Sequence, residues 1–339
     1  MPVTRKEIAE KAKVHPSVVS AVLNGSKTIH CSENKRREIL SLIKEMNYVP
    51  NHTARSLSMK KTKTIGILSF SLCDRYYASL ASEFQKQLIE RGYIGLFASW
   101  KNESEVKKAY DSVLTRNVDG IVTCHHQTDF LEKTNVPAVF FSGIESSSYD
   151  SVQVDYSSAV KNSLKYLTDM GHRRIGFVAA RDGEFRFDAF KKYMEEFGLE
   201  FREEWCVRSS GLPAAVHDGV MKLLARPGRP TAIMARNDMA AISTLSCAWA
   251  NHLKVPDDLS VIGFDNIEES AFSIPPLTTN VSRKEERVSA ALDLLLARIE
   301  DPARPPRKIL FESNLEVRGS CAPPKESRRK TTSNTRNRK

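Results

Sequence analysis

The stretch VTRKEIAEKAKVHPSVVSAVLNGS, residues 3–26, decides the fold of the N-terminal end of this chain. It opens with Thr4-x-x-Glu7, the spacing of a capping box, in which the threonine caps a backbone amide and the glutamate reaches back. This spacing predicts a short helix that begins at about Arg5. Pro16 suits the first position of a helix, so a second helix is predicted to begin there after a tight turn.

The predicted second helix has an apolar stripe made of Val18, Val19, Val22 and Leu23. The positions expected to face outward are Ser17, Ser20, Ala21 and Asn24. Ser32 is a good N-cap for a third helix, whose apolar repeat is Ile39, Leu40, Ile43 and Met46. Two short helices across a tight turn, supported by a third, are typical of a helix-turn-helix domain, whose second helix enters the DNA major groove.

The distribution of charge favours DNA binding over the alternative of a three-helix bundle with an ordinary solvated surface. Residues 1–63 contain 13 Lys and Arg against 5 Asp and Glu, and residues 325–339 contain 7 against 1. Since the whole chain carries +10, the stretch between these two ends is net acidic. A basic head on a neutral-to-acidic body is expected of a protein that binds phosphates through that head.

A short helix is also predicted after Tyr48-Val49-Pro50-Asn51, because Pro50 interrupts the preceding helix and Asn51 can cap the next. It would contain Ala54 and Leu57. A helix of about eight residues is marginal alone in water, so it should become ordered only against a partner.

Residues 3–66 resemble the head and hinge of the LacI/GalR family of bacterial repressors. The resemblance implies that the hinge helices of a dimer lie in the minor groove, where Leu57 would insert between base pairs and Ala54 would pack beside it. Such a wedge unstacks a base step at a cost of a few kcal/mol and bends the duplex. The alternative is that Leu57 is an ordinary apolar residue that closes a linker helix onto the body.

The predicted recognition helix departs from the family pattern. The family commonly has Thr-Val-Ser-Arg where this chain has Val18-Val19-Ser20-Ala21, and a missing arginine removes about 1–3 kcal/mol of discrimination for a guanine. The usual operator sequence should therefore not be assumed. The candidate DNA-binding residues are Thr4, His15, Pro16, Ser17, Ser20, Ala21, Asn24, Ser32, Asn51, Ala54 and Leu57.

From residue 64 onward, short apolar strands alternate with amphipathic helices. One series comprises residues 65–70, 94–99, 119–124 and 137–141, and a second comprises residues 173–180, 231–238 and 259–266. Continuous apolar strands that alternate with helices predict parallel sheets covered on both faces. Two such series imply two α/β lobes, with a ligand cleft at the carboxyl ends of the strands.

This body also resembles the LacI/GalR family, through GHRRIGFVAA at 171–180, the block at 236–266 and PPLTT at 275–279. The resemblance implies a fold similar to periplasmic sugar-binding proteins, in which the chain crosses between the lobes three times. We expect a helix-turn-helix domain at 1–49, a hinge at 50–63, a two-lobed core at 64–324 and a disordered basic tail at 325–339. Lobe 1 would contain about 64–155 plus 284–308, and lobe 2 about 156–283 plus 309–324.

The same resemblance implies a set of ligand-binding residues. Arg186 and Asp265 match the family arginine and aspartate that hydrogen-bond the ligand, and Asn237 matches an amide that both donates and accepts. Tyr76 and Tyr77 replace the aromatic pair of the family's Asn-Pro-Phe-Phe loop. Ser142 replaces a usual aspartate, which weakens the case for polyol recognition by paired acids. Each of these residues also has a structural reading, such as a helix cap or lobe packing.

Catalysis has little support in the sequence, which contains no phosphate-binding loop, no dinucleotide fingerprint and no nucleophile elbow. The six cysteines show no Cys-x-x-Cys spacing, and His125-His126 reads as a solvated loop, so we expect neither a metal nor a cofactor. With no signal peptide and no long apolar span, a cytoplasmic protein associated with the bacterial nucleoid is expected.

The sequence therefore predicts a homodimeric transcriptional repressor that binds a pseudo-palindromic operator in double-stranded DNA and responds to a small effector, a sugar or a sugar derivative. We expect no catalytic residues and no membrane partner. The alternative is a cytoplasmic carbohydrate-binding receptor or sugar-modifying enzyme with an incidental basic head. The absent signal peptide argues against the receptor, and the absent catalytic constellation argues against the enzyme.

Overall fold

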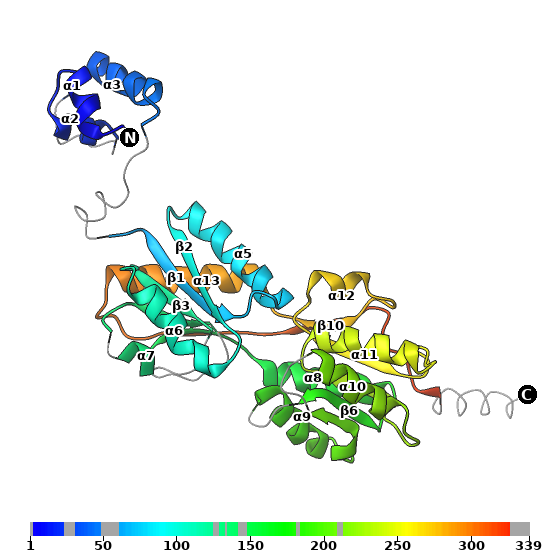
Figure 1. Ribbon diagram of the computed structural model, residues 1–339. Helices are drawn as coiled ribbons and strands as arrows, with labels where there is room; N and C mark the ends of the chain where they lie inside the picture. Colours follow the sequence, from blue (N-terminus) through cyan, green and yellow to red (C-terminus); the bar gives the residue numbers. More distant parts are fainter. Residues whose placement is uncertain are drawn as a thin grey trace, which may run out of the picture. The chain divides into compact units, whose positions relative to one another are not determined.

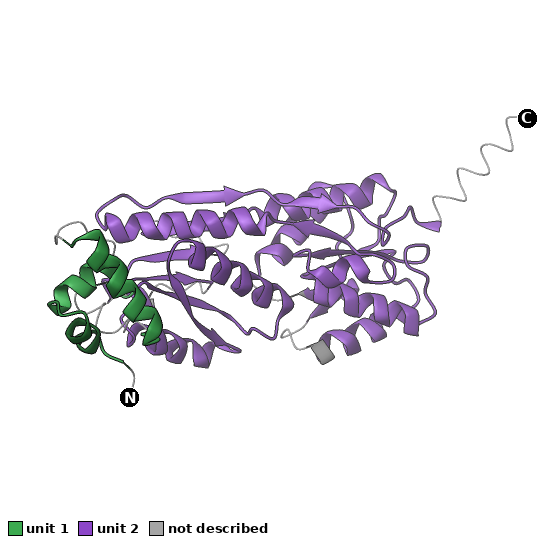
Figure 2. Ribbon diagram, turned by 90° about the horizontal axis from the view of Figure 1, so that it is seen from above, with its two compact units in different colours: residues 1–62 green, residues 63–339 purple. Residues whose placement is uncertain are grey.

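The computed structural model describes residues 3–23, 31–48, 61–124, 129–132, 134–141, 148–180, 184–208 and 213–325. The chain divides into two compact units, residues 1–62 and residues 63–339 (Figure 2). The expected boundary at residue 63 therefore lies next to the observed one. Each unit has its own apolar core, so each is described by itself.

The first unit is a bundle of three helices, as the capping signals predict. They are α1 (Arg5–Lys11), α2 (Pro16–Leu23) and α3 (Glu33–Glu45). Thr4 and Glu7 form the predicted capping box on α1, and Ser32 accepts a hydrogen bond from the Lys35 amide at the start of α3. Ile8, Val19 and Ile39, one from each helix, are fully buried together in the core.

Lobe 1 of the second unit contains β1, β2 and β3, which are labelled in Figure 1. Its sheet is parallel and six-stranded, in the order β11-β5-β4-β3-β1-β2. Its strands are β1 (Thr64–Phe70), β2 (Ile94–Trp100), β3 (Gly120–Thr123), β4 (Ala138–Phe141), β5 (Asp150–Val154) and β11 (Lys308–Phe311). Helices α5 (Arg75–Glu90) and α13 (Lys284–Glu300) share one apolar core with the sheet. Helix α6 (Glu103–Leu114) packs in a second apolar core, on the opposite face of the sheet. Helix α7 (Asp129–Glu132) follows β3.

Lobe 2 is a second six-stranded sheet, in the order β12-β10-β9-β8-β6-β7. Its strands are β6 (Ile175–Ala180), β7 (Cys206–Arg208), β8 (Ala232–Ala235), β9 (Ser260–Phe264), β10 (Thr278–Val281) and β12 (Asn314–Glu316). Its helices are α8 (Tyr156–Asp169), α9 (Phe185–Glu196), η1 (Glu203–Trp205), α10 (Pro213–Leu224), α11 (Asp238–Ala250) and α12 (Glu268–Phe272).

Successive side chains of β8 show how this sheet builds two cores. Ala232 and Met234 pack with α8 and α9, whereas Ile233 and Ala235 pack with α10 and α11. This is the alternation of a strand that is buried on both faces, and it explains why the strand has an uninterrupted apolar sequence.

Three crossings join the lobes, as the resemblance implied, and two details differ from the expectation. Strand β11 pairs with β5, so the third crossing follows Phe311 rather than residue 308. Strand β12 pairs antiparallel with β10, so lobe 2 is not purely parallel. The reason is that the chain leaves lobe 2 at the end of β10 and comes back into lobe 2 directly from β11 at the start of β12, so the two strands run in opposite directions.

Candidate functional site

The exposed start of α2 is the part of the first unit best placed to contact another molecule. His15 and Ser17 are exposed, and the His15 ring nitrogen Nδ1 lies 2.8 Å from Ser17 Oγ. Ser20, one turn further along, is half-buried and accepts a hydrogen bond from the Arg5 guanidinium. Arg5 is a residue that the sequence analysis missed, because its position beside α2 depends on how α1 and α2 pack.

Two expectations about exposure in this unit are wrong. Ala21 is only 5% exposed, although it was expected to face outward, and Leu40 is 46% exposed, although it was assigned to the apolar repeat of α3. Ala21 is buried because α2 packs against both α1 and α3, so the buried arc of α2 is wider than its stripe of large apolar residues. Ala21 is therefore one of the buried apolar residues of this unit, and little of its methyl group is open to contact.

The other DNA-binding candidates are placed as follows. Thr4 and Ser32 use their side-chain oxygens to cap α1 and α3, and Pro16 is the half-buried first residue of α2. Asn24, Asn51, Ala54 and Leu57 lie outside the described residues, as does the ligand-binding candidate Ser142.

In the second unit, Arg186 and Asp265 come together as the resemblance implied. Arg186, on α9, lies 3.1 Å from Glu184 and 3.7 Å from Asp265. Its guanidinium also covers the Tyr156 ring, 4.0 Å from the ring centroid. Glu184 and Tyr156 are additions to the predicted set. The guanidinium is thus held by two carboxylates and an aromatic face, with its donors fixed in direction.

Asp265 occupies an unusual turn after β9. Its φ is 103° and that of Asn266 is 51°, in the region that favours glycine. Three contacts hold this turn: the Asp265 amide donates to the Asn280 carbonyl at 3.0 Å, the Ile267 amide donates to Asp238 at 2.9 Å, and Arg318 donates to the Asn266 side chain at 2.7 Å. Strained backbone of this kind is typical of sites where a side chain must be aimed.

Burial raises the pKa of Asp265 to about 6, and the positive charge of Arg186 opposes this rise. The carboxyl group is therefore ionised at neutral pH and can accept hydrogen bonds from ligand hydroxyl groups. Below pH 6 it would become a donor as well, which changes what it can recognise.

Asp238 is fully buried beneath this turn, where it accepts hydrogen bonds from Thr279 and the Ile267 amide. Burial, and secondly the charge of Asp265, raises the pKa of Asp238 from 3.8 to about 7. The folded protein thus holds a proton there that the unfolded chain releases above pH 4. The resulting stability is complete below pH 4 and is lost as pH rises through 7.

We expect Asp238→Asn to remove this pH dependence. Between pH 4.5 and 7.5, the free energy of unfolding of the variant should rise relative to wild type by an amount on the order of 3 kcal/mol. Urea unfolding at several pH values measures this difference. Any constant effect of the altered hydrogen bonds cancels in the comparison across pH, so parallel stability curves would contradict the prediction.

The two tyrosines have different surroundings. Tyr76 accepts a hydrogen bond from Arg287 at 3.1 Å and its ring meets the Tyr77 ring edge-on, 5.2 Å between centroids. Tyr77 packs into lobe 1 against Phe70, 5.3 Å between ring centroids. Asn237 caps α11 by accepting a hydrogen bond from the Ala240 amide at 3.0 Å, so its oxygen already has a structural partner.

A cavity of about 320 Å³ lies between the lobes beside these residues. Tyr76 and Ser79 of α5 line one side, and Asp265, Asn266 and Ile267 line the other. The segment from Val281 to Glu286, where the chain passes from lobe 2 to lobe 1, completes the wall. A cavity of this size, built from both lobes with polar groups directed into it, can hold a small polar molecule.

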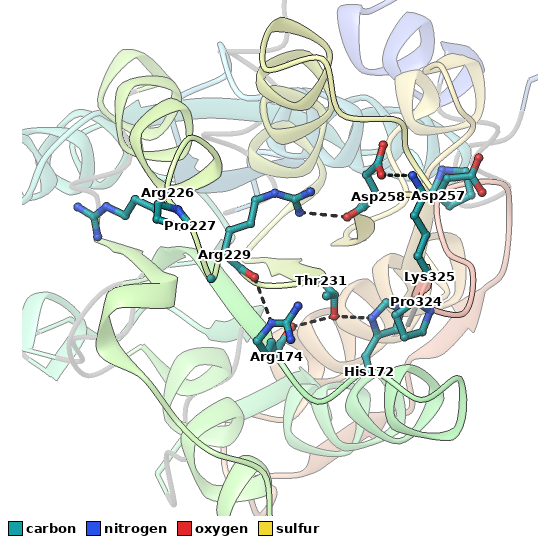
Figure 3. Close-up of a pocket in the computed structure, with 12 residues that line it drawn as sticks. His172, Arg174, Arg226, Pro227, Arg229, Thr231, Asp257, Asp258, Pro324 and Lys325 are labelled. Atoms are coloured by element: carbon teal, nitrogen blue, oxygen red, sulfur yellow. Dashed lines mark hydrogen bonds and ion pairs between the residues drawn. The ribbon is translucent and has the colours of Figure 1, made fainter. Parts of the chain in front are cut away.

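A second hollow, of about 310 Å³, lies on lobe 2 among Arg174, Arg229, Asp258 and Lys325 (Figure 3). Several of its polar groups bond to one another. Arg229 donates to the Asp258 carbonyl at 3.0 Å, and Lys325 pairs with the Asp258 carboxylate. These contacts attach the C-terminal segment to lobe 2.

His172 forms the floor of this hollow and is only 1% exposed (Figure 3). Its ring nitrogens lie 2.9 Å from Thr231 Oγ1, 3.1 Å from Ser260 Oγ and 3.0 Å from the Ala322 carbonyl. Because a carbonyl only accepts, the Nε2 atom must carry a proton. The role of His172 is thus structural, and the sequence analysis did not single it out.

We expect His172→Ala to lower the free energy of unfolding by about 2–4 kcal/mol, because it leaves buried polar partners without a hydrogen bond. His217→Ala is a matched control, since His217 is an exposed residue of α10. Urea unfolding compares the two variants. A loss below about 1 kcal/mol for His172→Ala would show that water replaces the ring.

Within the described ranges, no group of side chains is placed to hold a metal ion, and no helix is long and apolar enough to cross a membrane. All six cysteines are free thiols. His125 and His126 lie outside the described residues.

Comparison with known proteins agrees with both units. Residues 4–51 match the model of bacterial regulatory proteins of the lacI family, and residues 164–321 match that of the periplasmic binding protein-like domain. The chain is 31% identical over 338 residues to the HTH-type transcriptional repressor PurR of Escherichia coli O139:H28, covering 94% of this chain and 97% of the relative.

Two solved structures share the fold. One is the Lac repressor dimer bound to operator and the anti-inducer ONPF, with a TM-score of 0.84 and 22% identity, covering 95% of this chain and all of that chain. The other is a CelR–cellobiose complex, with a TM-score of 0.70 and 24% identity, covering 94% of this chain and 99% of that chain. With a helix-turn-helix head, a two-lobed core and a full-length relative above 30% identity, this chain belongs to the lacI family of bacterial regulatory proteins.

Proposed function

We propose that this protein is a homodimeric repressor that binds a pseudo-palindromic operator and is controlled by a small polar effector, a sugar or a sugar derivative. The observation that carries the proposal is the pairing of Arg186 with Asp265 beside a cavity between the lobes, in a chain that also has a helix-turn-helix head. The named relatives support both parts of the proposal, DNA-binding repression and control by a sugar, since one relative is a repressor and another was solved with cellobiose.

The effector would act by changing the angle between the lobes. Arg75 of α5 and Glu269 of α12 form an ion pair at 2.8 Å across the lobes, so the lobes already touch beside the cavity. The pair is exposed and contributes little free energy, which leaves the angle sensitive to a ligand. Regulation requires that the effector favour one arrangement by a differential free energy of about 1–3 kcal/mol.

Movement of lobe 1 would reach the hinge through Lys63, the residue that precedes β1. The Lys63 amide donates to Asp119 at 2.9 Å, and its carbonyl accepts from the Ile94 amide at 2.9 Å. Its ammonium group also lies 4.3 Å from the centroid of the Tyr93 ring. The chain thus leaves lobe 1 from a fixed point, so in a dimer a change in the lobe angle would alter the distance between the two hinges.

A gel shift on the chain's own promoter region, at several salt concentrations, tests DNA recognition. A sequence-preferring complex at moderate salt is expected, because phosphate contacts alone weaken steeply with salt. A thermal-shift screen of sugars, nucleobases and sugar phosphates would find the effector, since a ligand raises apparent stability in proportion to RT ln(1 + [L]/Kd). Absence of any sequence-preferring complex would favour a receptor or an enzyme instead.

In the cell, the proposal places the protein at operators on the bacterial nucleoid. The candidate DNA contacts in the described residues are His15, Ser17 and Ser20, supported by Arg5. The hinge residues Asn51, Ala54 and Leu57 are proposed contacts on the strength of the family resemblance alone.

A further inference from the structure

We propose that the effector carries an anionic group, a carboxylate or a phosphate, and that Arg287 is the residue that selects it. This inference rests on the proposed function, because it names the chemical class of the effector. Arg287 belongs to α13 and is 1% exposed, which makes it one of the largest fully buried side chains of the chain. It was not among the ligand-binding residues that the family resemblance implied.

Arg287 is surrounded by neutral groups. Its Nη1 atom donates to Tyr76 Oη at 3.1 Å and to Ser282 Oγ at 2.8 Å, and its guanidinium lies 4.6 Å from the centroid of the Phe141 ring. Among the described residues, no carboxylate lies within 4.0 Å of its side chain, and its Nε atom has no hydrogen-bond partner. A buried cation without a counter-ion is costly, since a ring and two hydroxyl groups only partly replace its hydration.

Arg186, on α9 of lobe 2, provides a contrast. Its side chain is 11% exposed and its Nε atom, like that of Arg287, has no hydrogen-bond partner, but it lies near two carboxylates, those of Glu184 and Asp265. Its charge is therefore neutralised by the protein, which leaves it suited to bind hydroxyl groups. Arg287 lacks such neutralisation, so an incoming anion would gain more there than at Arg186.

A ligand in the cavity of about 320 Å³ would meet Arg287 through its two hydroxyl partners, since Arg287 itself is not among the lining residues. Tyr76 and Ser282, the two hydroxyl groups that accept from Arg287, both line that cavity. A hydroxyl group that accepts from arginine still has its own proton to donate, so both can donate to an anion in the cavity. Burial raises the pKa of Tyr76 above its usual value of 10, which keeps this donor protonated.

The charged side chains around the start of α13 cancel one another, because Arg283 and Lys284 line the cavity together with Glu285 and Glu286. The Lys284 ammonium group donates to Ser79 Oγ. A preference for an anion would therefore come from Arg287 and its hydroxyl partners. Asp265 lies in the wall formed by lobe 2. A sugar acid or sugar phosphate would fit this cavity, with its hydroxyl groups toward Asp265 and its charged group toward Tyr76 and Ser282, the two hydroxyl partners of Arg287.

The test compares matched ligands on the full-length protein by isothermal titration calorimetry. The probes are galactose, galacturonate and galactose 6-phosphate, and the corresponding glucose series. We expect at least one anionic sugar to bind wild type about tenfold or more tightly than its neutral parent. The carboxylate and phosphate arms identify which of the two anions the site prefers.

Three variants then assign this preference to Arg287. Arg287→Met keeps the length and apolar contacts of the side chain and should abolish the preference for the anion, whereas Arg287→Lys should keep part of it. Arg283→Met is the matched control, because Arg283 also lines the cavity but is exposed and paired with Glu286 at 3.2 Å. It should keep most of the preference.

A ligand-free measurement checks the physical basis of the inference. Without an anion, Arg287→Met should melt at a higher temperature than wild type, because the variant no longer buries an uncompensated charge. Equal or tighter binding of the neutral sugars by wild type, no binding of any anionic probe, or an unchanged preference in Arg287→Met would each overturn the inference. Operator binding is measured separately, so those results would leave the repressor proposal standing, and loss of operator recognition would refute that proposal alone.

Discussion

Arg186→Ala is expected to weaken effector binding at least about 100-fold, which corresponds to about 3 kcal/mol. The guanidinium lies 3.1 Å from Glu184 and 3.7 Å from Asp265, so its removal leaves two carboxylates, each only 10% exposed, without their cation. It also removes the charge that holds down the pKa of Asp265. The carboxyl group would then be protonated over more of the neutral range and would accept fewer hydrogen bonds from the ligand.

Calorimetry with the effector found in the screen measures this loss, and a gel shift on the operator measures DNA binding without effector. If the effector is an inducer, operator binding by the ligand-free variant should match wild type, because Arg186 belongs to the second unit. Arg173→Ala is a suitable control, since Arg173 is an exposed arginine of the same lobe. Effector affinity within about threefold of wild type would remove Arg186 from the binding site.

Leu57→Ala is expected to weaken binding to the specific operator about tenfold to 100-fold while leaving nonspecific DNA binding nearly unchanged. The expectation follows from the family resemblance, in which this leucine unstacks a base step and bends the duplex so that more protein contacts it. Nonspecific binding depends mainly on phosphate contacts, which the substitution does not touch. Gel shifts with operator and scrambled duplexes at equal salt separate the two effects.

The control for this experiment is Leu40→Ala. Leu40 is a 46% exposed leucine of α3, so the substitution removes the same side chain from the head without emptying its core. It should bind the operator like wild type. Equal weakening of operator and scrambled DNA by Leu57→Ala would show that the leucine stabilises the hinge generally and does not act as a wedge.

The sequence predicts the fold where apolar periodicity is strong. Strands such as β1 and β8 have long apolar runs because both of their faces are buried. Strands β5, β7, β10, β11 and β12 were missed. Strands β7, β11 and β12 are short edge strands, and polar residues interrupt β5 and β10, whose sequences are Asp-Ser-Val-Gln-Val and Thr-Thr-Asn-Val. Polar residues can be buried in β10 because tertiary partners satisfy them, as when Asn280 bonds Ser163, and no local pattern encodes that pairing.

The candidate site was predicted in part, through the family resemblance and not through apolar periodicity. Arg186 and Asp265 are far apart in the sequence, and only the family resemblance linked them before the structure brought them together. Tyr156 and Glu184 were missed because an aromatic ring and a helix cap have many ordinary roles. Arg287 was missed because an arginine in an amphipathic helix normally faces solvent, and its burial follows from the packing of α13 against lobe 1.

The turn at Asp265 and Asn266 limits how the specificity of this regulator could be changed. Both residues have positive φ, so most substitutions there alter backbone stability together with ligand contacts. Tyr76 lies on regular helix and Ser282 on the crossing segment, without that constraint. Variation toward a new effector, in evolution or in a designed sensor, is therefore easier on the lobe 1 wall of the cavity, while the lobe 2 turn should remain the constant half of the site.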